Sequence, residues 1–150
     1  MINLLEEFEK LIKELPLPHG KKPVLMQYHS DGYFQKIAIP CSPRSIITIY
    51  MYQDDLQIAC YVYENNRWTN YQLLRILNKR ARETGPREKQ PAFSSLDELL
   101  LYYIRCAHFL LLQYGDDVLK GDLEWIKEYT LTPLPAGDLT YFLEKNNITF

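Results

Sequence analysis

The residues that most often carry chemistry in proteins, histidine and cysteine, are few in this chain and widely separated. They are His19, His29, His108, Cys41, Cys60 and Cys106. A transition-metal site usually needs three or four ligands at recognisable spacing, and the chain has no HxxxH, HxH or CxxC pattern. Cys60 and Cys106 fall within apolar runs, which favours buried thiols over ligands. We therefore expect no metal and no cofactor.

No local signature of catalysis accompanies these residues. The six glycines are widely separated, and the chain contains neither a GxSxG elbow nor a glycine-rich phosphate loop. The adjacent carboxylates at 54–55 and at 116–117 both fall in expected turns. Catalytic sets that assemble only in the fold leave no such trace in a sequence. On the residues alone, we expect a protein that is not an enzyme.

Arg105 and His108 are three residues apart on the most apolar segment of the chain. Together with Glu98 and Tyr102 they would form one polar edge of a helix. One interpretation is a partly buried polar site. The other is the rim of a core helix, in which Arg105 pairs with Glu98 or another carboxylate, because an unpaired buried arginine is too costly.

Residues 45–67 are typical of two consecutive antiparallel strands whose faces differ chemically. A turn at Asp54-Asp55 would place Ile49 opposite Cys60 on an aliphatic face, and tyrosines on the other face. A slip of one residue would mix the two sets, so the alternation predicts this register. The aliphatic face requires a covering layer of helices.

The face that carries the tyrosines is the best candidate binding surface. The chain has twelve tyrosines, and four of them share this face. Tyrosine offers a large contact area with few rotors and a polar tip, which is why it is enriched at protein interfaces. A second layer, such as the C-terminal helices, could instead cover these side chains. The predicted partner-binding residues are Tyr50, Tyr52, Tyr61, Tyr63, Asp54, Asp55 and Arg67.

A first hairpin is expected before these strands. Asp31-Gly32 is a strong signal for a type I′ turn, which needs positive φ at both central residues. That turn would place Val24 opposite Ile39 on the aliphatic face and Lys36 on the other. We expect the two hairpins to be separated at Pro40–Pro43 and to form a four-stranded antiparallel meander.

Apolar residues at helical spacing predict that most of the remaining chain is helical. Ser95 and Glu98 fit a capping box, while residues 68–74 could either extend the sheet or belong to a helix. The expected helices are 3–15, 70–83, 95–113, 117–129 and 138–145, the last two separated by a turn at Pro133–Pro135. The sequence thus predicts a single α+β domain over residues 1–150. In it, an antiparallel meander of four or more strands carries helices on one face, and the C-terminal half is helical.

Residues 75–89 carry six basic and two acidic side chains. Such a segment could receive an acidic partner surface or phosphates. It is also typical of a solvated helix face followed by a loop. We regard this segment as the second candidate interface, suited to an acidic partner.

Charge and hydropathy limit the classes of partner. The net charge of −2 does not indicate a general nucleic-acid binder. The acidic N-terminal segment does not resemble a signal peptide. The longest apolar segment, 99–112, contains two basic side chains and is too short to cross a bilayer. We expect a cytoplasmic protein with no nucleic-acid and no membrane partner.

The sequence SLDELLLYY (residues 95–103), with Ala107 further on, resembles a helix start in bacterial polymorphic-toxin immunity proteins, the Imm63-like group in particular. In that group a strand-rich half with tyrosines precedes this helix, and YVYENNR (residues 61–67) suits the layout. The resemblance covers roughly residues 56–112. It implies a protein that binds and neutralises a cognate toxin by occlusion, and it implies no enzymatic residues. The alternative is a small α+β enzyme or ligand-binding domain with its polar site near Arg105/His108.

Overall fold

The computed structural model describes residues 6–7, 10, 24–27, 35–52, 55–84, 92–137, 139 and 143–144, with the backbone alone at 24–27, 35, 51–52, 55, 83–84 and 96. The strands in this part of the chain are β1 (Val24–Gln27), β2 (Gln35–Ser42), β3 (Ser45–Tyr52), β4 (Asp55–Glu64), β5 (Arg67–Tyr71) and β6 (Leu134–Gly137). They form one antiparallel sheet, and each strand pairs with its neighbour in the sequence. The predicted antiparallel meander is confirmed.

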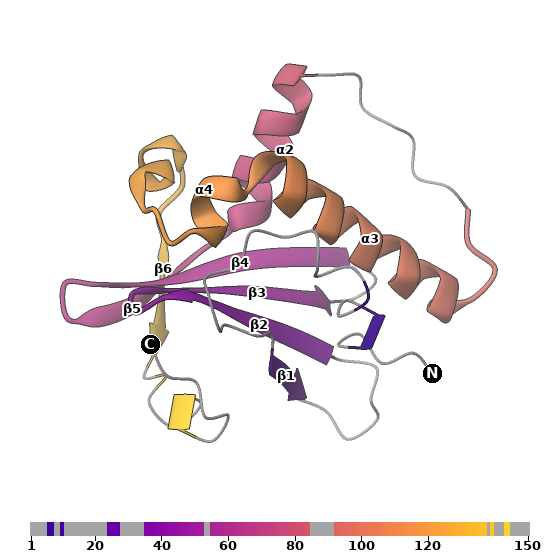
Figure 1. The fold of residues 1–150 in the computed structure, drawn as a ribbon, viewed down its shortest axis with the longest axis horizontal. Coiled ribbons are helices and arrows are strands. Elements are labelled where there is room, and N and C mark those ends of the chain that lie inside the picture. Colours follow the sequence, from indigo (N-terminus) through magenta and orange to yellow (C-terminus); the bar gives the residue numbers. More distant parts are fainter. Residues whose placement is uncertain are drawn as a thin grey trace.

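A helical layer connects β5 to β6. Its elements are α2 (Leu73–Thr84), α3 (Leu96–Tyr114), α4 (Asp116–Leu119) and the 3-10 helix η2 (Glu124–Glu128). Figure 1 shows α2, α3 and α4 on one side of the sheet. The predicted α+β class is therefore confirmed. The prediction of a helical C-terminal half is only partly right, because β6 returns the chain to the edge of the sheet.

The faces of β3 and β4 are as predicted, but their register is not. Ile49 lies opposite Ile58 instead of Cys60, and Tyr52 pairs with Asp55, so the turn is one residue earlier than expected. The register therefore differs by two residues. An even shift keeps every side chain on its own face. The alternation of apolar residues could not distinguish the two registers, since both bury the same set.

The predicted register of the first hairpin is wrong by one residue. Val24 pairs with Ala38 rather than Ile39, so the grouping of Val24 with the aliphatic face is also wrong. The last described pair is Gln27 with Gln35, which leaves an odd number of residues between the two strands. The expected turn at Asp31-Gly32 itself lies outside the described residues.

Pro40 lies inside β2, although a break was expected there. The pairing of β2 with β3 is irregular between Pro40 and Ser42, and the turn at Pro43–Arg44 connects the two strands directly. Proline has no N–H to donate to a neighbouring strand, so a bulge is the usual way to accommodate it. The two hairpins are thus continuous.

The sequence analysis did not predict that the turn at Asn65-Asn66 is a tight hairpin turn between β4 and β5. Asn65 and Asn66 have φ of 52° and 62°, the left-handed values that a type I′ turn requires. This turn makes Arg67–Tyr71 a strand, and α2 begins only at Leu73. The open question about residues 68–74 is thereby answered: they contain the end of a strand and the start of a helix. Asparagine tolerates positive φ better than most residues, so the Asn-Asn pair was the available signal.

The main core lies between the helical layer and the aliphatic face of the sheet. Its completely buried members are Ile37, Ile39, Ile47, Cys60, Val62, Leu73, Leu77, Ala107, Leu111 and Leu119. The capping interaction of α3 is confirmed, since the Ser95 hydroxyl accepts a hydrogen bond from the Glu98 N–H at 3.2 Å. The Glu98 carboxylate accepts from the N–H and the hydroxyl of Ser94, one residue earlier than a capping box would have it. In the described part of the chain, we find no helix that is both long and apolar enough to cross a membrane.

The predicted helix 117–129 is broken in the middle. Gly121 has φ of +85°, and a Cβ built on it would lie 2.7 Å from the Cβ of Ser42. The chain can make this close, left-handed approach only with glycine. After this turn η2 continues for five residues and buries Trp125.

The turn predicted at Pro133–Pro135 is wrong, because β6 begins at Leu134 and Pro135 pairs with Thr69 in this edge strand. Of the predicted helix 138–145, only Leu139 and residues 143–144 are described. The N–H of Leu143 donates to the Leu139 carbonyl at 2.9 Å, as in a helix. The predicted helix 3–15 lies almost wholly outside the described residues, of which 6–7 are helical.

Ile49→Asp should destabilise the protein by about 3 kcal/mol or more, because it buries a carboxylate that has no partner. Ile49 is 1% exposed and lies under the helical layer. Urea denaturation followed by circular dichroism measures the change. The matched control is Gln57→Asp, which places the same carboxylate on the opposite face of the neighbouring strand, at a half-buried position. Equal losses in the two variants would contradict the assignment of faces.

Candidate functional site

The predicted partner-binding residues do not form one uniform surface. Tyr50 and Tyr61 are half-buried, whereas Tyr63 is 38% exposed. Arg67 is exposed and pairs with Glu64, so it lies on the sheet face opposite Tyr63. The backbone places Tyr52 and Asp55 at the far end of β3 and β4, and Asp54 lies outside the described residues.

Lys36 occupies the middle of the tyrosine-bearing face. Its side chain is buried, and its Nζ lies 4.8 Å from the ring centroid of Tyr50 and 4.9 Å from that of Tyr61. The same ammonium donates a hydrogen bond of 2.6 Å to the hydroxyl of Tyr61. Burial raises the pKa of that hydroxyl, so it accepts the bond in its neutral form. The sequence placed Lys36 on this face, but it did not reveal that the lysine holds two of the candidate tyrosines.

A second, smaller core closes another part of the same face. Ala38, Ile46 and Trp68 form its buried centre, and Leu139 and Leu143 pack against it. C-terminal residues, which were considered as a possible cover for the tyrosine-bearing face, therefore cover the part of that face around Trp68. Tyr61 also contacts this core. Among the tyrosines of this face whose side chains the structure describes, only Tyr63, near the β4–β5 turn, is substantially exposed.

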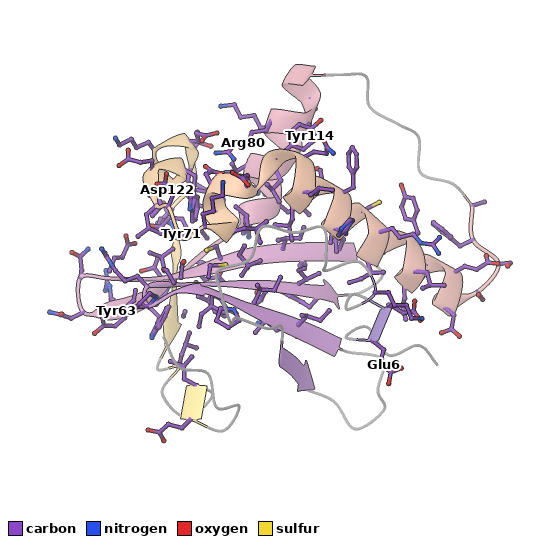
Figure 2. The ribbon with its side chains drawn as sticks, viewed as in Figure 1. Glu6, Tyr63, Tyr71, Arg80, Tyr114 and Asp122 are labelled. Atoms are coloured by element: carbon purple, nitrogen blue, oxygen red, sulfur yellow. The ribbon has the colours of Figure 1, made fainter. Side chains whose placement is uncertain are left out.

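We define the sheet end as Arg44, Tyr63, Asn65, Asn66 and Arg67. All five side chains are exposed, and they come from the two neighbouring turns between β2 and β3 and between β4 and β5. Figure 2 shows Tyr63 at the projecting end of the sheet, away from the start of α3. The sheet end combines one aromatic side chain, two guanidinium groups and two amides.

The backbone of the sheet end is well supported. The Tyr63 N–H donates to the Arg44 carbonyl at 2.8 Å, and the Arg44 Nε donates to the Tyr63 carbonyl at 3.1 Å. The Tyr63 ring lies 5.4 Å from the Trp68 ring across the two strands. These contacts join the turn between β2 and β3 to the end of β4, so each supports the conformation of the other. A preorganised surface loses less entropy when a partner binds.

Glu64 connects the sheet end to the helical layer. Its carboxylate accepts a short hydrogen bond from the hydroxyl of Tyr71. The Tyr71 ring in turn contacts Trp125 at 5.4 Å and Tyr129 at 5.0 Å, both edge-on. Burial and the nearby Glu64 carboxylate raise the pKa of Tyr71, so its hydroxyl stays protonated and donates. The β4–β5 hairpin is therefore fixed to the layer by η2.

The residues of the polar edge predicted on α3 differ in their exposure to solvent. Arg105 is exposed, whereas His108 is buried and only 8% exposed. The predicted pairing of Arg105 with Glu98 is not present, since the Glu98 carboxylate binds Ser94 at the helix start. Among the described residues, no group of three or more His, Cys, Asp or Glu could hold a metal ion. The expectation that the protein binds no metal stays a prediction, because His19 and His29 lie outside that part.

Arg80 is the centre of an ion network that sequence reasoning missed. Its guanidinium binds both carboxylate oxygens of Asp117, at 2.8 and 3.0 Å, and both of Glu128, at 3.1 and 2.6 Å. It also donates to the Tyr114 carbonyl at 2.6 Å, and Figure 2 shows the two residues together above the sheet. The carboxylates of Glu128 and Asp117 raise the pKa of Arg80. Although burial opposes it, the bond to Arg80 leaves the pKa of Asp117 below its usual value.

In the basic segment of residues 75–89, only some of the positive charges are therefore available to a partner. Arg80 is committed to two carboxylates, whereas Arg75, Lys79 and Arg82 are exposed on the same helix. These three are four and three residues apart, so they share one face of α2. Residues 85–89 of the predicted segment lie outside the described part of the chain.

Arg80→Met should lower the free energy of unfolding by about 1–3 kcal/mol, because two carboxylates and a carbonyl lose their shared donor. The depressed pKa of Asp117 contributes stability above the ordinary aspartate pKa of about 3.9, and this contribution is lost as the pH falls through the folded value. The variant should accordingly lose less stability than the parent between pH 5 and pH 3, roughly the range in which such groups titrate. Urea denaturation across this range measures both effects.

Arg82→Met is the matched control for this change, since it removes the same charge from an exposed position on the same helix. Its effect should be within about 0.5 kcal/mol of zero. Equal effects of the two substitutions would show that the network contributes no specific stability.

Comparison with known proteins gives no relative from which a function could be transferred. No family model matches the chain, and no curated protein or solved structure matches it significantly. The function must therefore be argued from the residues and from the geometry of the described surface.

Proposed function

We propose that this protein is an immunity-type inhibitor that binds a cognate bacterial toxin and neutralises it by occlusion. Two independent lines support the proposal. The resemblance of residues 95–103 to the helix start of toxin-immunity proteins supports the identity of the partner. The composition of the sheet end supports the mode of action, which is protein binding.

The exposure of Tyr63 at a rigid turn is the observation on which the binding surface depends. Tyrosine and arginine are the side chains most enriched among the residues that dominate binding energy. Here Arg44 hydrogen-bonds the backbone of Tyr63, and Arg67 lies at the same end of the sheet on its other face. The asparagine pair adds exposed amides. The two arginines outnumber the single carboxylate of Glu64, which is engaged with Tyr71. The sheet end is thus suited to an acidic patch on the toxin.

Tyr50 and Tyr61 are less suited than Tyr63 to anchor an interface. Tyr50 and Tyr61 contact the Lys36 ammonium and support the fold of the sheet face. Truncating them would disturb that buried contact as well as any interface. Tyr63 is therefore the anchor of the proposed interface, and Tyr61 is a supporting residue.

The alternative function, an enzyme or ligand-binding domain near Arg105/His108, is not favoured by a specific observation. Such a site would need both side chains to face one pocket. Arg105 points to solvent, whereas His108 is buried. A cavity of about 230 Å³ lies beside α2, and neither of them lines it.

Tyr63→Ala should weaken binding to the toxin at least about tenfold, because an aromatic anchor at the centre of an interface typically contributes about 2 kcal/mol or more. Arg67→Glu should mainly slow association, as expected for a charge at the rim. Isothermal titration calorimetry and stopped-flow fluorescence measure the two effects. The toxin to use is the protein encoded beside this one, because immunity proteins are encoded next to their toxins.

Phe109→Ala is the matched control. Phe109 is an exposed aromatic residue on α3, 52% accessible, and it lies outside the sheet end. Its truncation should leave the affinity unchanged. Circular dichroism and the melting temperature must show that each variant is folded. If folded Tyr63→Ala binds as tightly as the parent, the interface lies elsewhere; if the toxin does not bind the parent protein, the proposed function fails.

A further inference from the structure

A groove separates α2 from the segment that follows η2. Arg75, Ile76 and Lys79 line one side, and residues 128–131 line the other. Its volume is about 230 Å³, below the range of about 300–1,000 Å³ typical of small-molecule pockets. The floor is apolar, since Ile76 is 3% exposed and Tyr129 is half-buried. A space of this size suits one apolar side chain.

The walls of the groove are held before any partner arrives. The Tyr129 hydroxyl accepts a hydrogen bond from the Gln72 N–H at 3.2 Å, and its ring packs edge-on against Tyr71. Both oxygens of the Glu128 carboxylate bind Arg80. The Arg75 Nε donates to the Gln72 side-chain oxygen at 2.8 Å. The groove is therefore preformed, which lowers the cost of binding.

Exposed positive charges outnumber the single carboxylate around the groove. Arg75 and Lys79 are exposed on its rim, and Arg82 continues the same face of α2 one turn further. The one carboxylate in the lining, Glu128, binds Arg80, which it shares with Asp117. Leu131, at 42% exposure, adds an apolar contact at the mouth. A cationic row thus runs beside an apolar pocket for a single side chain.

We propose that this groove docks an acidic segment of a partner polypeptide, with one apolar side chain of that segment seated on Ile76 and Tyr129. The acidic side chains would pair with Arg75, Lys79 and Arg82. The apolar lining distinguishes this occupant from phosphate or a polyanion, which would use the cations and leave the pocket empty. The groove is separate from the sheet end, so this site does not depend on the function proposed above.

The test uses synthetic peptides and the purified ¹⁵N-labelled protein. The probe is a decapeptide of alternating aspartate and glutamate with one central leucine. One comparison peptide has alanine in place of the leucine, and another has asparagine and glutamine in place of all the acids. Titration at millimolar concentration, followed by amide chemical shifts, detects affinities even at the weak limit near 1 mM.

The probe should shift the amides of α2 between Arg75 and Arg82 and those of residues 128–131. Both comparison peptides should bind at least about fivefold more weakly. Lys79→Glu should reduce the affinity of the probe about tenfold or more. The matched control, Lys120→Glu, reverses an exposed charge directly after α4 and should not change it. Tyr63→Ala should also leave peptide binding unchanged, which separates this site from the sheet end.

Three results would overturn the proposal. The first is the absence of shifts at the groove with the probe at millimolar concentration. The second is equal binding of the alanine peptide, which would mean that the pocket holds no side chain. The third is displacement of the probe by inorganic phosphate at a similar concentration, which would make the site a simple anion site.

Discussion

The two-faced pairing of β3 with β4 is the constraint on which the rest of the structure depends. Ile47, Ile49 and Ile58 form an aliphatic surface that cannot remain in water, because each such side chain contributes about 1.5–3 kcal/mol when it is fully buried. The chain therefore places its helical layer between β5 and β6, where α2 and α3 can cover this face. The other face is free to hold polar and aromatic residues.

Two polar connections fix the helical layer to the sheet and to itself. Arg80 joins α2 to the end of α3, to α4 and to η2. Tyr71 joins the turn end of the β4–β5 hairpin, through Glu64, to Trp125 of η2. Both connections leave other groups exposed. The first leaves a cationic row on α2, and the second leaves Tyr63 and Arg67 at a rigid end of the sheet.

Much of this architecture could be predicted from the sequence, because alternation of apolar residues determines which face is buried. The same alternation cannot determine a register to within two residues, since Ile49 is equally well buried opposite Ile58 or Cys60. Turn residues would have improved the prediction. Asn65-Asn66 indicates a type I′ hairpin, and Gly121 indicates the end of a helix.

The candidate site was less predictable, because it depends on contacts between residues far apart in the chain. No local pattern shows that Lys36 lies between Tyr50 and Tyr61, or that Arg80 meets Asp117 and Glu128. These contacts decide which of the candidate tyrosines and arginines remain available to a partner. A count of tyrosines or of positive charges along the sequence cannot show which of them remain available.

The proposed role of the sheet end is most directly tested by hydrogen–deuterium exchange of the protein alone and in complex with its toxin. Occlusion by an interface centred on Tyr63 predicts slower exchange of the backbone amides around the β4–β5 turn and at Arg44. Amides of α3 around Arg105 and Phe109 should exchange at the same rate in both states. Protection confined to α3, or to any surface that excludes residues 63–67, would contradict the account.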